Sequence, residues 1–185
     1  MTIGEIKDFA IEAYHEPSGP EWGGFGRLAI HIRGTCLGKI RENHCSLFHA
    51  TDRFRTLLGL SKSDRSHRTI ETLWENGFAS LSDSEIFTVI DRELYSGAPT
   101  NNQPRYVDFD FLTNTGEMFD DAKTFLICKP EGAAHILYQF ADGSFGSGSC
   151  CVRTFRSVAD AYIRWFDEKV RTTSPPFFPV DPFTP

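Results

Sequence analysis

The sequence predicts a single α+β domain built on an antiparallel sheet of about six or seven strands, with helices packed mainly on one face. Three observations favour this class. A length of 185 residues suits one domain. Alternating apolar runs at both ends of the chain enclose helical patterns in the middle. The 17 Phe, five Tyr and three Trp supply enough apolar area for a core without disulfides or a metal. We assign 1–171 to this domain and 172–185 to a proline-rich tail.

The N-terminal part of the chain predicts three antiparallel strands. The first begins at Phe9, because apolar side chains recur at every second position from there. Charged residues interrupt every apolar run before 16, so we expect no secretory signal. A loop rich in Gly and Pro covers 17–26, and RLAIHIR forms the second strand. A short third strand is expected near 37–41.

The middle of the chain predicts helices. Apolar residues recur at helical spacing after Ser46, and Gly59 is a plausible end of that helix. A weaker helical segment is expected at 70–74. Ser82 and Glu85 match the S-x-x-E capping box, in which each residue binds the other's backbone N–H, and they predict the start of the next helix.

The C-terminal part returns to strands and closes with a helix. The turn signal Asp142–Gly143 precedes the last strand. A final helix is expected over 156–170, with one apolar face. The strand-like runs are YVDFDFL, TFLICK, HILYQFA and a last one around CCVR.

Charge and cysteine content limit the partners and the compartment. The formal net charge of −6 disfavours nucleic acid and anionic membranes, whose affinity comes largely from Lys and Arg. It favours encounter with a basic protein, although mild acidity can also serve solubility alone. No apolar run approaches the roughly 18 residues of a membrane span. Five cysteines without CxxC pairs favour reduced thiols and a cytoplasmic location.

Two patterns resemble binding sites, and both have a simpler explanation. GFGRLA at 24–29 fits the letters of a dinucleotide fingerprint, but a strand follows it where that site requires a helix. Cys45, His49 and Asp52 lie on one helical face, with His44 beside them, yet the spacing matches no familiar zinc site. A thiol buried on the inner face is the commoner arrangement. We therefore predict no cofactor and no metal.

Nucleophilic catalysis is not indicated either. GSFGSGSCC offers Ser144, Ser147 and Ser149 but lacks the G-x-S-x-G elbow. Cys150 and Cys151 would point to opposite faces of a strand, so at most one reaches a given histidine. We predict that the protein is not an enzyme.

An acidic segment and one aromatic residue are the candidate binding residues. The segment contains no Lys or Arg from 106 to 122, and in a strand Asp108 and Asp110 would share one face. An ordinary solvated face is the alternative; a D-x-D pair can also hold Mg²⁺, but no phosphate-binding loop accompanies this one. Trp22, in the Gly-rich loop, would either anchor an interface or fold back over the sheet edge. The predicted binding residues are Asp108, Asp110, Glu117, Asp120, Asp121 and Trp22.

Several short motifs resemble the immunity protein 42 family of bacterial polymorphic toxin systems. They are an early Ile-Gly, the strand FAIE, a Gly-rich turn followed by a strand, and a corner from Gly34 to Gly38. FDDAKTFLICKPEGAAHILYQF and the helical AYIRWFDE are similar to the C-terminal part of that family. The resemblance covers roughly residues 1–168 and leaves out the tail.

The resemblance implies a cytoplasmic protein that binds and silences a cognate toxin. We expect that toxin to be basic, because an active site for nucleic acid or nucleotides must hold phosphate groups. Replacing Asp108 and Asp110 by Lys should then weaken the complex at least about tenfold and leave the fold intact. A small cytoplasmic enzyme and a regulatory protein-binding module are the alternatives. The toxin's activity and the oligomeric state stay open.

Overall fold

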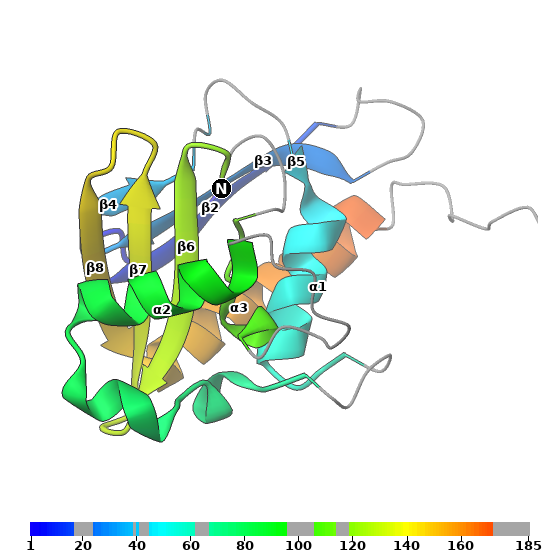
Figure 1. Cartoon of the computed structure of the whole chain (residues 1–185). Coiled ribbons are helices and arrows are strands. Elements are labelled where there is room, and N and C mark those ends of the chain that lie inside the picture. The colour runs from blue at the N-terminus through cyan, green and yellow to red at the C-terminus, as the bar shows by residue number, and fades with distance from the viewer. Residues whose placement is uncertain are drawn as a thin grey trace, which may run out of the picture.

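A computed structural model describes residues 1–16, 24–38, 40, 45–61, 67–95, 106–113 and 119–171 of the chain. Within these residues it contains three α-helices, eight β-strands and short 3₁₀ segments (Figure 1). The strands form two antiparallel sheets, one of five strands and one of three. Trp22, His44, Glu117 and the 172–185 tail lie outside the described residues, as does most of the 17–26 loop.

The larger sheet is built from the N-terminal strands, and its order is β1-β2-β3-β4 with β5 paired to β3. Ile11 lies opposite Ile30 in the central pair, and the alternation predicted from Phe9 onward is confirmed by the burial of Phe9 and Ile11. The third predicted strand occurs earlier than expected, because Arg33 and Gly34 adopt positive φ and reverse the chain at once. The strands are β1 (Thr2–Gly4), β2 (Phe9–His15), β3 (Phe25–Ile32), β4 (Thr35–Leu37) and β5 (Cys45–Ser46).

The smaller sheet is a meander of β6 (Ala122–Lys129), β7 (Ala133–Phe140) and β8 (Phe145–Cys151). The predicted turn before β8 is confirmed. Gly143 has a φ of 83°, and the Asp142 carboxylate accepts hydrogen bonds from the backbone N–H and the hydroxyl of Ser144.

Three helices cover the sheets: α1 (Leu47–Leu57), α2 (Asp83–Tyr95) and α3 (Val152–Phe166). The capping box at the start of α2 is confirmed, since the backbone N–H of Ser82 donates to Glu85 Oε2 at 2.8 Å. The final helix begins at Val152, earlier than predicted, and ends in a π-helical turn at Asp167–Arg171. The weaker helical segment near 70–74 contains a 3₁₀ turn, Ile70–Thr72.

One core extends through both sheets: α1 and α3 pack on the larger sheet, and α2 crosses the smaller sheet (Figure 1). The Phe54 ring of α1 meets the Tyr162 ring of α3 edge to face, with centroids 5.4 Å apart. Phe155 stacks on Phe9 of β2, which joins α3 to the sheet. On the other side of the protein, Phe87 of α2 packs against Phe125 of β6.

The α+β class and the antiparallel pairing are confirmed, but the strands divide between two sheets instead of forming one. The strand predicted for the segment YVDFDFL is also wrong. It forms a 3₁₀ turn at Val107–Phe109, followed by an isolated bridge between Asp110 and Phe125. This turn buries Asp108 together with Phe109, whereas a strand would place these neighbours on opposite faces.

Candidate functional site

The carboxylate of Asp108 points into the protein. Its Oδ1 lies 2.6 Å from His67 Nδ1, and its side chain is only 12% exposed. Arg53 of α1 donates a hydrogen bond to the backbone carbonyl of the same residue. The covering basic side chains come from segments 41 and 55 residues away in sequence, which is why the acidic run looked unpaired.

Asp110 is also engaged within the chain. Its carboxylate accepts hydrogen bonds from the backbone N–H of Thr113 and from the hydroxyl of Tyr95, both at 3.3 Å. Burial lowers the pKa of the Arg53 guanidinium, and the charges of Asp110 and Asp108 oppose that effect. The two aspartates therefore stabilise a buried cation, which favours a structural role for them.

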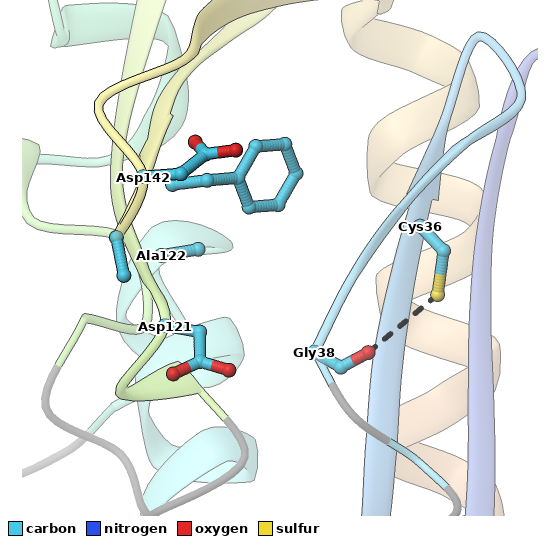
Figure 2. A pocket seen from close by; sticks show the side chains of 7 residues that line it. Cys36, Gly38, Asp121, Ala122 and Asp142 are labelled. Carbon is cyan, nitrogen blue, oxygen red and sulfur yellow. Dashed lines mark hydrogen bonds between the residues drawn. The ribbon is translucent and has the colours of Figure 1, made fainter.

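The remaining described carboxylates of the segment, Asp120 and Asp121, lie at two adjoining surface depressions, and we call the one that Asp121 lines the acidic hollow. Asp120 is exposed and Asp121 is half-buried, just before β6. The hollow has a volume of about 370 Å³ and separates the end of β4 from the β7–β8 turn (Figure 2). Its lining residues are Cys36, Gly38, Asp121, Ala122, Phe140, Ala141 and Asp142.

A second depression of about 250 Å³ adjoins the hollow and shares Asp121, Ala122, Phe140 and Ala141 with it. It adds Asp120 and Lys123 to the lining. The Lys123 ammonium lies 2.6 Å from Asp91 and 4.8 Å from the centre of the Tyr95 ring, so it is held by α2. Three carboxylates, those of Asp120, Asp121 and Asp142, thus surround a small apolar floor.

Asp142 belongs to this surface although the sequence indicated only a turn there. Hydrogen bonds from the hydroxyl and backbone N–H of Ser144 lower the pKa of Asp142, because they stabilise the charged form of its carboxylate. The aspartate lies 21 residues beyond Asp121 in sequence and reaches the hollow through the β6–β7–β8 meander. No linear pattern of charge marks that proximity.

A Ser-His-Asp arrangement occurs where α2 meets the smaller sheet. His135 Nε2 lies 2.8 Å from Asp83 Oδ2, and His135 Nδ1 lies 2.5 Å from Ser149 Oγ. Ser147 and Lys129 also bind the Asp83 carboxylate, at 2.7 and 3.2 Å. A neutral histidine that donates from Nε2 and accepts at Nδ1 satisfies this network.

This cluster fastens the start of α2 to β7 and β8. Burial lowers the pKa of His135, against the opposing influence of Asp83. The His135 side chain is 5% exposed, and Asp83 is shared among three partners on the sheet. A buried histidine held on both sides has no open approach for a substrate, so we assign the cluster a structural role.

The predicted metal candidates do not converge. Cys45 is buried in β5, and burial raises the pKa of its thiol to about 12, whereas His49 and Asp52 are exposed on α1. Across the described part of the chain, no three His, Cys, Asp or Glu side chains gather in a metal-binding group. The GFGRLA segment continues into β3, as expected. Among the same residues, no helix is both long and apolar enough to cross a membrane.

The protein matches the family model described as Immunity protein 42 over residues 1–165. The chain belongs to the immunity protein 42 family. This confirms the resemblance found in the sequence and identifies a cognate toxin as the partner class. Immunity proteins of this kind are typically toxin-binding proteins without enzymatic activity, which agrees with the absence of a predicted nucleophile.

A solved structure is similar to this member of the immunity protein 42 family: the crystal structure of CdiI from Burkholderia dolosa AUO158. The TM-score is 0.59 at 17% sequence identity, and the match covers 89% of this chain and 99% of that chain. At this identity the likeness establishes a shared fold. No curated protein matches the sequence.

Proposed function

We propose that this protein neutralises a cognate bacterial toxin by binding it in the cytoplasm and occluding its active site. Membership of the immunity protein 42 family over residues 1–165 is the observation that carries the proposal. The net charge of −6 favours fast encounter with a basic toxin, because opposite charges steer the two proteins together.

We place the toxin contact at the acidic hollow. Of the four predicted acidic residues that the structure describes, Asp120 and Asp121 line the two depressions. Asp108 and Asp110 instead stabilise the charge of Arg53, and Asp110 also binds the neighbouring loop. Asp142 adds a third carboxylate. A concave surface with an apolar floor and a charged rim suits a Lys or Arg side chain, whose stem packs while its head pairs. Glu117 and Trp22 remain proposed contacts outside the described residues.

Co-expression tests the function directly. The toxin domain encoded immediately upstream should be lethal alone and harmless beside this protein, and the two should purify as a complex. Continued lethality together with failure to isolate any complex would refute the proposal.

Paired charge reversals test the surface. Asp120→Lys with Asp121→Lys should weaken toxin binding at least about tenfold, about 1.4 kcal/mol, with a larger effect at low salt. Glu93→Lys with Glu131→Lys is the matched control, since both residues are exposed on other parts of the surface and the net charge changes equally. If both double variants stay folded and lose the same affinity, general charge and not the hollow controls binding.

A further inference from the structure

The hydrogen-bond pattern of the smaller sheet fixes the direction in which each β8 backbone group points. Phe140 N–H donates to the Ser144 carbonyl at 2.9 Å, and Val152 N–H donates to the Gly132 carbonyl at 3.0 Å. These two pairs continue the β7–β8 register by one residue at each end. In an antiparallel ladder hydrogen-bonded pairs alternate with non-bonded ones. The even-numbered residues of β8 therefore face β7.

The odd-numbered residues of β8 turn their backbone groups outward, away from β7. They are Phe145, Ser147, Ser149 and Cys151. Ala141 N–H, which donates to Asp121 at 2.8 Å on the β6 side, fits the same alternation along β7. Among the described residues, no backbone hydrogen bond joins these outward groups to another strand, and β8 forms the outer edge of its sheet (Figure 1).

This edge lacks the usual protection against pairing with another chain. Natural edges are short, bulged, or broken by Lys or Pro. β8 is seven residues long, its register with β7 runs without a bulge, and the stretch from Gly143 to Val152 contains no charged residue and no proline. The edge strands β1 and β4 of the other sheet have three residues each.

The opposite edge of the smaller sheet, strand β6, is partly covered by another segment. In the described part of the chain, β8 is therefore the open edge of this sheet. Phe111 N–H donates to the Thr124 carbonyl at 3.0 Å, and Thr113 Oγ1 accepts a hydrogen bond from Thr124 N–H at the same distance. The segment after the 3₁₀ turn thus occupies the outward backbone groups of Thr124 in β6.

Charge marks the two ends of the open edge. Asp142, beside the acidic hollow, precedes β8, and exposed Arg153 follows it at the start of α3. Between them, Ser147 is exposed and Ser149 is half-buried, and neither side chain is bulky. The complement is an extended segment, uncharged in its middle, with a basic residue near Asp142 and an acidic residue near Arg153.

We propose that the cognate toxin adds such a segment to β8 by main-chain hydrogen bonding, with its basic residue entering the acidic hollow. The inference rests on the proposed function and specifies how the partner is recognised. Backbone pairing supplies affinity, and the charged ends select the segment and its direction.

Amide hydrogen exchange of the full chain, followed residue by residue by NMR, tests the pairing. In the free protein the amides of Ser147 and Ser149 should exchange much faster than those of Gly146 and Gly148. In complex with the toxin domain encoded immediately upstream, Ser147 and Ser149 should slow at least about tenfold, while Gly146 and Gly148 stay protected in both states.

A proline substitution gives a second measurement. Ser147→Pro removes an outward N–H and leaves the ladder to β7 intact, so the fold should persist while toxin affinity falls at least about tenfold. Ser147→Ala is the matched control: it also loses the hydroxyl that binds Asp83, but it keeps the N–H and should bind like the wild type.

The outcomes separate the two proposals. A complex that forms while the Ser147 and Ser149 amides keep their free exchange rates overturns the β8 inference and leaves toxin neutralisation standing. Absence of any complex with the wild-type protein overturns both. Protection that grows with protein concentration without toxin means that a second copy occupies the edge, and it also overturns the inference.

Discussion

Replacing Gly148 by Ala should loosen the packing between the two sheets. Gly148 lies in β8 with its Cα against the end of β3, and a methyl group there would sit 2.6 Å from Ile32 Cγ1 and 3.4 Å from Arg33 Cγ. Ile32 is 1% exposed, so the atom that must move is fully packed.

The expected cost follows from that overlap. Carbon atoms in contact are separated by about 3.5–4.0 Å, so the new methyl group is too close by roughly 1 Å. Displacing a packed core side chain by this much, or shifting the strand that holds it, costs about 1–3 kcal/mol. The Arg33 contact adds little, because the long arginine side chain can move aside.

Urea unfolding of the two purified proteins measures the difference, with the midpoint shifting and the slope unchanged. Gly77→Ala is the control: its added methyl group meets no atom within 4 Å, and stability should change by less than about 1 kcal/mol. Equal stability of Gly148→Ala and the wild type would show that β8 does not pack on Ile32 as described.

Three further predictions concern the N-cap of α2, Asp108 in the 3₁₀ turn, and His135, which fastens α2 to the smaller sheet. Ser82→Ala should lower the free energy of unfolding by about 1 kcal/mol, measured with urea, because it removes the N-cap of α2. Asp108→Lys should destabilise the fold by at least about 2 kcal/mol, seen as a lower thermal midpoint, because it places a second cation beside Arg53; a midpoint equal to the wild type would contradict this. Burial lowers the pKa of His135, so the folded state takes up its proton less readily than the unfolded state, and stability should fall as pH drops below about 6.5. His135→Gln should flatten that dependence in urea midpoints taken from pH 8 to 5; an unchanged slope would assign it to other groups.

Local patterns predicted the elements whose partners are near in sequence. The alternation at Phe9 and the capping box at Ser82 each depend on a few neighbouring residues, and both are confirmed. The single sheet was not predicted correctly, because strand pairing depends on contacts between distant segments such as Ile32 and Gly148. The start of α3 at Val152 was missed because Cys151 supplies no side-chain hydrogen bond as N-cap.

The acidic segment shows the same limit for a binding site. Alternation placed Asp108 and Asp110 together on an open strand face and predicted that lysines there would leave the fold intact. The structure instead pairs them with His67, Arg53 and Tyr95, from three separate segments. Sequence charge alone cannot tell an exposed carboxylate from a paired one when the partner side chain lies more than 40 residues away.

The residues proposed to contact the toxin contribute little to the core. Asp120 is exposed and Asp142 accepts its hydrogen bonds from Ser144 in its own turn. In the described part of the chain, the outward backbone groups of β8 have no other strand as partner. Stability comes instead from the aromatic packing of α1 and α3 on the larger sheet and from the Asp83–His135 anchor of α2. The carboxylates of Asp120 and Asp142 can therefore change with little effect on folding, while main-chain pairing along β8 tolerates many partner sequences. Ser147 and Ser149 take part both in the contacts that fold the protein and in those proposed to bind the toxin, but with different atoms, because their hydroxyls bind the Asp83–His135 anchor while their backbone groups point to the outer edge of β8.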